Sequence, residues 1–293
     1  MKVLSTLSMT LLVACLTACG GASSSTSSSS TGFLQLSATD APLDPALVES
    51  AEVVVDRGRI HRSGDDDVDG DSGGWIEIFD GPPRTLPLSD LRNGITALIS
   101  NAELATGTYG QVRLHLTGGE LVLTNGDVFT TADGSLHMPS ATNSSGLKVK
   151  FTNDLVIETD VTKNVVLDFD LSRTFKPVPG NDPLNANHFK LHPVIRAAVL
   201  EGSGDLNVLV REDDGAGTLV AVENATVYVL APGELDVEEA LASSITDATG
   251  TAIVVGLDPG TYDVRAETAT SAVQMNSVVI TAGSASAIDL ILP

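Results

Sequence analysis

Apolar and polar residues alternate along this chain in short runs, and no stretch has the 3.6-residue period of a long helix. In residues 33–38, for example, Leu34 and Leu36 alternate with Gln35 and Ser37. Such alternation places one set of side chains on the buried face of a strand and the other set on its exposed face. Similar runs occupy residues 51–61, 75–79, 111–116, 121–123, 147–151, 165–171 and 189–199.

The same pattern continues in residues 205–293, with clearer turns between the runs. Residues 247–250 read Asp-Ala-Thr-Gly and predict a tight turn whose glycine takes a positive φ. Pro259-Gly260 predicts a chain reversal, after which alternate residues of 262–266 point to one face of a strand. Residues 287–292 form a last alternating run. Short strands between such turns are typical of all-β sandwiches.

We therefore expect an all-β chain with two β-sandwich domains, at residues 33–201 and 205–293. Within the first domain, Asn125-Gly126 predicts a hairpin with a type I′ turn. A short helix of a turn or two is expected at Ser89-Asp90.

The tripeptide Gly-Thr-Tyr occurs once in each predicted domain, at residues 107–109 and 260–262. The inward set after the first copy is Val112 and its alternate neighbours. This spacing places Tyr109 on the opposite face unless a β-bulge intervenes. The two domains are therefore interpreted as related sandwiches rather than as a strict repeat.

Residues 1–18 have the features of a secretory signal peptide, because a positive charge precedes an apolar run at 4–14 that is too short to span a bilayer. The segment closes on Leu-Thr-Ala-Cys-Gly at 16–20, which resembles the lipobox of bacterial lipoproteins. This resemblance implies cleavage before Cys19, which then carries the acyl chains. A glycine at position 20 implies sorting to the outer membrane of a Gram-negative bacterium.

Residues 19–32 would then join the lipid to the folded part. The tract is rich in serine and cannot bury apolar surface, so it is expected to be a flexible tether of about 20 Å. The anchor makes the membrane a partner, and the sequence leaves open whether the protein faces the periplasm or the cell surface.

The chain holds 16 Lys and Arg against 38 Asp and Glu, a formal net charge of −22. This acidity argues against nucleic acid as a partner, because such binding depends on cationic contacts with phosphates. It also disfavours peripheral binding to anionic lipid, so attachment would rest on the acyl anchor.

Five segments resemble, in order, the bacterial family known as domain of unknown function 4382. They are LSATDAP at 36–42, AELATGTYGQVRLHL at 102–116, SGLKVKF at 145–151, VVLDFDLSRTF at 165–175 and FKLHPVIRAAV at 189–199. The resemblance covers nearly all of residues 33–201. It implies a β-rich envelope domain and lends no catalytic residues.

Residues 243–268, SSITDATGTAIVVGLDPGTYDVRAET, resemble carboxypeptidase-regulatory-like and prealbumin-like modules. The resemblance lies in the Thr-Asp pair, the turn glycine, the Leu-x-Pro-Gly-x-Tyr corner and the alternating strand. It implies a prealbumin- or immunoglobulin-like β-sandwich with a carbohydrate-binding-like fold. Tyr228 and Tyr262 are the only aromatic residues after position 200, which weakens a carbohydrate-binding role for this domain.

The stretch SGDDDVDGDSGG at 63–74 is the strongest candidate for a metal site. Asp65, Asp67, Asp69 and Asp71 alternate as carboxylates do in calcium loops. An EF-hand is disfavoured because its twelfth position would be Ile76 and because strands rather than helices flank the loop. Two interpretations stay open: a looser calcium site, or a solvated hairpin tip. No other cofactor is expected.

Trp75 is the only tryptophan and follows this loop. It is a candidate ligand-binding residue, since an exposed indole can stack on a sugar, and it can equally cover one end of the sandwich.

The remaining candidates for catalysis or metal binding are weak. Asp168 and Asp170 share one face of a strand, as glycosidase carboxylates do, and are interpreted as a solvent-facing stripe. His188 and His192 are four residues apart, but the neighbouring proline favours a strand over a zinc-binding helix. Cleavage before Cys19 would leave no free thiol.

We therefore predict a non-enzymatic envelope lipoprotein for binding, adhesion or scaffolding. The alternative is a surface carbohydrate-binding protein, and a hydrolase is a more distant one. A glycan or an envelope protein is the expected partner.

Overall fold

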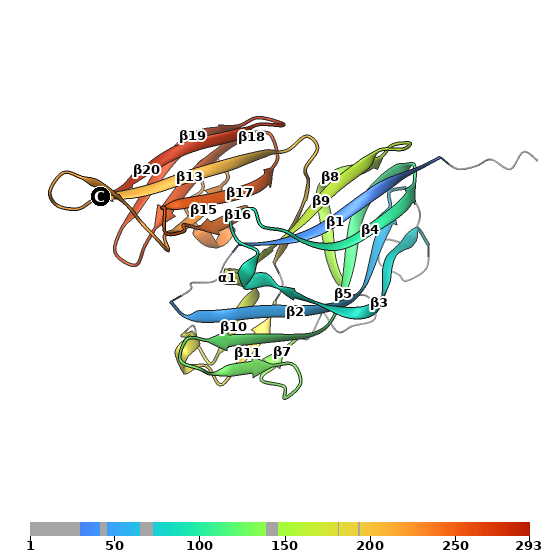
Figure 1. The fold of residues 1–293 in the computed structure, drawn as a ribbon, viewed down its shortest axis with the longest axis horizontal. Coiled ribbons are helices and arrows are strands. Elements are labelled where there is room, and N and C mark those ends of the chain that lie inside the picture. The colour runs from blue at the N-terminus through green and yellow to red at the C-terminus, as the bar shows by residue number, and fades with distance from the viewer. Residues whose placement is uncertain (1–29, 42–45, 65–72, 139–145, 181, 193) are drawn as a thin grey trace, which may run out of the picture.

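The computed structural model describes residues 30–41, 46–64, 73–138, 146–180, 182–192 and 194–293. Almost all regular structure in this part of the chain is β-strand, and two sandwiches lie side by side (Figure 1). The predicted all-β fold is confirmed. Its helical elements are single turns: η1 (Leu88–Asp90), α1 (Leu171–Thr174), η2 (Pro183–Asn185) and η3 (Val237–Glu239). Among the described residues, no helix is long and apolar enough to cross a membrane.

The first sandwich is built on one long sheet with the strand order β3-β2-β5-β8-β12-β9-β1-β4, and β6 pairs with β5. Its strands are β1 (Thr31–Ala41), β2 (Val48–Arg62), β3 (Trp75–Pro87), β4 (Ala97–Ala105), β5 (Gly107–Leu123), β6 (Val128–Thr130), β8 (Leu147–Ile157), β9 (Thr162–Asp170) and β12 (Ile195–Val199). The sheet curls so that its edges β3 and β4 approach each other. The hydroxyl of Ser100 on β4 donates to the carbonyl of Ile78 on β3 over 2.8 Å.

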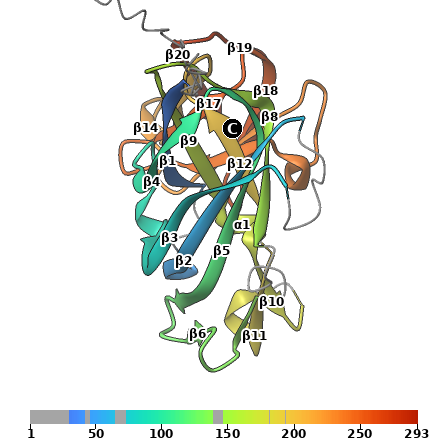
Figure 2. The same ribbon diagram turned by 90° about the vertical axis from the view of Figure 1, so that its right-hand side faces the viewer.

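The alternating residues identified in the sequence line the inner face of this curled sheet. Leu36, Leu114 and Leu167 are fully buried members of one hydrophobic cluster. A small sheet of β10 (Phe175–Val178), β11 (His188–Leu191) and β7 (Leu136–His137) lies at the end away from the second domain (Figure 2). There Phe129 and Phe189 pack edge to face, with ring centroids 4.7 Å apart.

The second sandwich has its own hydrophobic cluster, centred on Val208, Val227 and Val264. In one of its sheets, β13 pairs with β17 and then with β14 along one edge and with β20 along the other. The second sheet has the order β16-β15-β18-β19. The strands are β13 (Gly204–Asp213), β14 (Leu219–Ala221), β15 (Thr226–Leu230), β16 (Ala242–Ile245), β17 (Thr251–Leu257), β18 (Gly260–Glu267), β19 (Ala272–Ile280) and β20 (Ala285–Leu292).

The turn at Asn125-Gly126 differs from the predicted geometry. The hairpin forms, with Leu121 opposite Phe129, but the amide of Gly126 donates to the carbonyl of Leu123 over 2.9 Å. The central turn residues are therefore Thr124 and Asn125, and neither has the positive φ that type I′ requires. Gly126 alone is left-handed, at φ 90°, which is the geometry of a turn followed by a glycine bulge.

A β-bulge decides the position of Tyr109. The pairing of β5 with β8 shifts register between Tyr109 and Gln111, so the tyrosine turns inward and is fully buried together with Val112. Its hydroxyl donates to the carbonyl of Ala105 over 2.8 Å. In the second sandwich, the hydroxyl of Tyr262 donates to the carbonyl of Asp258 over 2.7 Å. Both Gly-Thr-Tyr copies therefore end a turn with the same bond to a carbonyl four residues upstream.

Candidate functional site

The second domain packs on the outer face of the long sheet, where β16 contacts β1 and β17 contacts β12. Strand β9 lies beneath this contact, and all its residues from 165 to 170 are buried. The odd-numbered ones belong to the core, and Val166, Asp168 and Asp170 lie on the outer face. The near-continuous VVLDFD run thus belongs to a strand that is covered on both faces.

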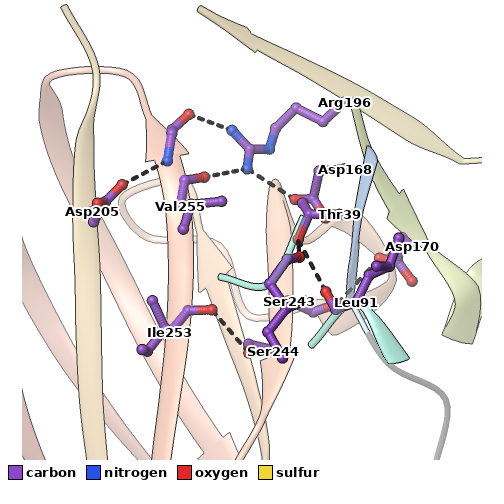
Figure 3. Close-up of polar contacts among 12 residues, drawn as sticks. Thr39, Leu91, Asp168, Asp170, Arg196, Asp205, Ser243, Ser244, Ile253 and Val255 are labelled. Carbon is purple, nitrogen blue, oxygen red and sulfur yellow. Dashed lines mark hydrogen bonds and ion pairs between the residues drawn. The ribbon is translucent and has the colours of Figure 1, made fainter. Parts of the chain in front are cut away.

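Arg196 joins the two domains across this junction (Figure 3). It lies on β12 directly opposite Asp168 on β9, and its Nη2 donates to the Asp168 carboxylate over 2.9 Å. The same guanidinium donates to two carbonyls of β17, those of Val255 at 2.8 Å and Gly256 at 2.5 Å. Burial raises the pKa of Asp168 above its ordinary value, and the charge of Arg196 acts in the opposite sense.

Asp170 forms a second bridge. Its carboxylate accepts from the amide of Arg173 at 3.1 Å, from Nε of the same residue at 2.7 Å and from the Ser243 hydroxyl of the second domain at 3.3 Å. Arg173 in turn donates from Nη1 to the carbonyl of Glu238 at 2.8 Å. Nearby, burial above all raises the pKa of Tyr228 to about 12, and Glu267 and Asp170 contribute to this shift.

Asn93 forms a third bridge from the turn after η1. Its side-chain oxygen accepts from the amide of Ile253 on β17 at 3.2 Å, and the Ser244 hydroxyl lies 3.5 Å away. Thr39 on β1 holds the turn in place, because its hydroxyl donates to the carbonyls of Leu91 and Ile95. The junction is therefore fixed by hydrogen bonds from β9, β12 and this turn.

Gly256 allows β17 to approach β12. A Cβ atom at this position would lie 2.6 Å from Cβ of Ala198, which is closer than two side chains pack. The amide of Gly256 donates to Asp205 at 3.0 Å while its carbonyl accepts from Arg196. Any larger residue would push the domains apart at this point.

A cavity of about 580 Å³ lies along this junction, within the size range of small-ligand sites. Cations and carboxylates line it together, with an aromatic ring and short apolar side chains. Its charged and aromatic lining residues are Lys150, Asp168, Asp170, Arg173, Arg196, Glu239, Asp258 and Tyr262. Burial raises the pKa of Tyr262. The ring therefore presents a neutral phenol to the cavity at ordinary pH.

The structure corrects the interpretation of Asp168 and Asp170 as a solvent-facing stripe. Both are buried, at 7% and 6% exposure, because the second domain covers their face of β9. Arg196 is the residue that the sequence analysis did not single out. The sequence feature that could have identified it is an arginine inside the apolar run VIRAAV. That run predicts a strand, which could pair with the strand that carries the two aspartates.

The chemistry of the cavity suits recognition by polar contacts. The carboxylates of Asp168 and Asp170 are paired with arginines and, for Asp170, with a hydroxyl donor, and no histidine or cysteine is found among the described residues that line the cavity. A hydrolase with acid and histidine side chains converging in a pocket was one alternative, and this cavity does not provide that combination.

Trp75 lies at the start of β3, half-buried and away from the cavity. The guanidinium carbon of Arg113 lies 3.9 Å from the centre of the indole, so one ring face is occupied by a cation–π contact. His61 packs against the same ring, with centroids 4.8 Å apart and ring planes at 58°. Sugar stacking on Trp75 would have to use the part of the ring that these neighbours leave open.

Cys19 and the four aspartates Asp65, Asp67, Asp69 and Asp71 lie outside the described residues. Lipidation and calcium binding therefore stay predictions. In the described part of the chain, no group of three His, Cys, Asp or Glu side chains is arranged to hold a metal ion. His188 lies on β11, a strand as predicted, and His192 follows that strand.

Comparison with solved structures gives matches of low TM-score, three of which are named here. They are the TIE protein of Bacillus anthracis (10% identity, 90% of this chain, TM-score 0.24), the minor pilin GBS52 of Streptococcus agalactiae (11%, 88%, 0.24) and the major pilin subunit BcpA of Bacillus cereus (7%, 89%, 0.23). This chain spans 34%, 94% and 70% of their lengths. Likenesses with such scores carry no argument about function.

Comparison with curated proteins gives no match. A family model does match, over residues 31–193, which is more than half of the chain. The matched region contains the strands β1 to β11, and with them Asp168, Asp170 and Lys150 of the cavity. The chain thus belongs to the family described as domain of unknown function (DUF4382).

Proposed function

We propose that this protein is a lipid-anchored binding protein of the bacterial cell envelope, and that it holds a small polar ligand in the cavity between its two domains without chemical conversion. The observation that carries the binding role is the cavity itself. It lies at a domain junction, where ligand sites are common, and several polar side chains converge on it.

Three features support this role. Arg196, Asp170 and Asn93 tie the domains together, so the cavity is pre-formed and a ligand would bind with little ordering cost. Donors such as Lys150 and acceptors such as Asp258 face the same space, which suits a ligand carrying both hydroxyl and charged groups. The lipobox-like segment ending at Cys19 supports an envelope location.

The anchor is tested by metabolic labelling with a fatty-acid probe. The wild-type chain should incorporate the label and fractionate with outer membranes, and Cys19→Ser should do neither. A wild-type product that stays unlabelled in the soluble fraction would contradict the anchor and leave the binding role to be judged on the cavity alone.

The binding role is tested by filling the cavity. Thr152 is exposed and lines the cavity, so Thr152→Trp should occupy the ligand volume. Arrays of bacterial glycans and envelope metabolites should show wild-type binding that falls at least about tenfold in this variant, a loss of about 1.4 kcal/mol. Thr85→Trp, at an exposed position on β3, is the matched control and should bind as the wild type does. Equal binding by both variants would exclude the cavity.

A further inference from the structure

The cavity between the domains is lined by charged side chains of two kinds, those held in ion pairs and those outside them. Asp168 is paired with Arg196 at 2.9 Å, and Asp170 is paired with Arg173 at 2.7 Å. The charges of each pair cancel, so these four residues give the cavity no net sign. Its sign therefore depends on the remaining charged residues of the lining. They are Lys150, Glu239 and Asp258.

These remaining residues leave the lining with an excess of negative charge. Lys150 and Glu239 are exposed, and neither forms an ion pair with another described residue. The Asp258 carboxylate accepts from the side-chain amide of Asn153 at 3.0 Å, and no cation pairs with it in the described part of the chain. Two carboxylates thus stand against one ammonium group, in a chain whose net charge is −22. The cavity and the field around it both favour a ligand with a positive charge.

Asp168 gives a second, independent indication of what the ligand supplies. Its side chain is buried, yet Arg196 donates to only one of its carboxylate oxygens, Oδ2 (Figure 3). No described residue donates to the other oxygen, Oδ1. Buried polar atoms are nearly always hydrogen-bonded in folded proteins, and each exception needs an explanation. Because Asp168 lines the cavity, a ligand held there can supply the missing donor.

The groups that favour a cationic donor lie along one stretch of the cavity wall. The guanidinium of Arg196 donates to Asp168 and to the carbonyl of Gly256. Asp258 follows Gly256 by two residues, and its carbonyl accepts from the Tyr262 hydroxyl at 2.7 Å. Since the phenol proton is occupied in this bond, Tyr262 offers a ligand its ring and its oxygen lone pairs. An aromatic ring attracts an ammonium group through its negative face.

We propose that the cavity binds a small molecule with a primary ammonium group beside oxygen atoms, the chemistry shared by amino sugars and amino acids. This inference rests on the proposed binding function and narrows its ligand. The ammonium group donates to Oδ1 of Asp168 and is attracted by Asp258 and by the ring of Tyr262. Lys150 and the hydroxyl of Thr152, which share one face of β8, bind the oxygen atoms of the ligand.

The proposal is tested by titration calorimetry of the purified full chain with two pairs of probes, at about pH 7, where an amine is mostly charged. Glucosamine is compared with glucose, and L-alanine with L-lactate, so that a hydroxyl replaces the ammonium group within each pair. At least one amine should bind about tenfold or more tightly than its hydroxyl counterpart. Tighter binding of glucosamine would identify an amino sugar as the source, and tighter binding of alanine would identify an amino acid.

The outcomes separate this inference from the proposed function. Glucose or lactate binding as tightly as the amines would overturn the ammonium group and leave the binding function standing. The same holds if no amine binds at about 10 mM while array ligands bind the wild type and not Thr152→Trp. Absence of binding by every probe and every array ligand would overturn both.

Two variants remove one negative charge each while keeping the shape of the side chain. Asp168→Asn and Asp258→Asn should each weaken binding of the amine about fivefold or more. Glu212→Gln, at an exposed position on β13, makes the same change in net charge and should leave binding unchanged. Asp258 lies on a partly exposed turn, so Asp258→Asn keeps the test decisive should Asp168→Asn fail to fold. Amine binding that is equal in Asp258→Asn and Glu212→Gln would overturn the proposal.

Discussion

At the residue scale, the function of a side chain here depends on which face of its strand is covered. Asp168 is a good example, because it carries a charge on a strand that is buried on both faces. A carboxylate in that position loses hydration, and Arg196 compensates only in part, so the proton is held more tightly than in an exposed aspartate.

We predict the pH dependence that follows. The folded-state pKa of Asp168 lies above its ordinary value of 3.8. Its contribution to the free energy of unfolding is therefore fully present below pH 3.8 and is lost as the pH rises through the folded-state pKa. The stability of the wild type relative to Asp168→Asn should therefore improve as the pH falls from 7 toward 4, by about 1.4 kcal/mol for each unit of pKa increase. Urea unfolding at several pH values measures this difference.

Asp214→Asn provides a control of opposite sign. Amide donors, Ala216 first and then Thr218, lower the pKa of the Asp214 carboxyl. Its stabilising contribution is present above the ordinary pKa and is lost as the pH falls through the lowered folded-state value. The advantage of the wild type over Asp214→Asn should shrink in acid. If the stability difference between wild type and variant changed with pH in the same direction for Asp168→Asn and Asp214→Asn, the raised pKa of Asp168 would be contradicted.

At the element scale, the packing of β17 on β12 depends on one glycine. Gly256 has φ 67°, and an added Cβ would meet Ala198 at 2.6 Å. Gly256→Ala should therefore combine backbone strain with a steric clash and cost about 3 kcal/mol of unfolding free energy. Gly217 has φ 85° but open space around it, so Gly217→Ala should cost only about 1–2 kcal/mol. Chemical denaturation compares the two, and equal losses would contradict the close approach.

The two Gly-Thr-Tyr copies have the same local structure at the scale of the strand and its turn. Each tyrosine follows a turn and donates to a carbonyl four residues upstream, and in each copy the strand pairing shifts register directly after the tyrosine. The bulge reverses the face on which Tyr109 lies relative to a regular strand.

At the scale of the whole molecule, the junction makes the two sandwiches one unit. Arg196 is the central contact, since one guanidinium joins a buried carboxylate to two carbonyls of the other domain. Arg196→Leu should leave Asp168 buried without its charge partner and should cost about 3 kcal/mol or more. Without the contacts of Arg196, the single unfolding transition expected of the wild type should separate into two, because each domain has its own core.

Arg265→Leu is the matched control for this variant. Arg265 pairs with Glu267 within the second domain, and both side chains are partly exposed, so the loss should stay below about 1 kcal/mol. Calorimetry and urea unfolding distinguish the two variants. A single transition with a similar small loss in both would mean that Arg196 does not couple the domains.

The sequence by itself determined the all-β class, most of the strands and the family, because alternation and turn residues are local properties that need no partner to be recognised. It also located the hairpin at Asn125 and the strand that carries Asp168 and Asp170. It misjudged their exposure, since nothing along β9 reveals that a second domain covers its outer face. Only the tertiary structure brought Arg196 to Asp168 and set both against β17 of the second domain. Register and domain packing decide which distant residues meet, and neither is written in any single stretch of the chain.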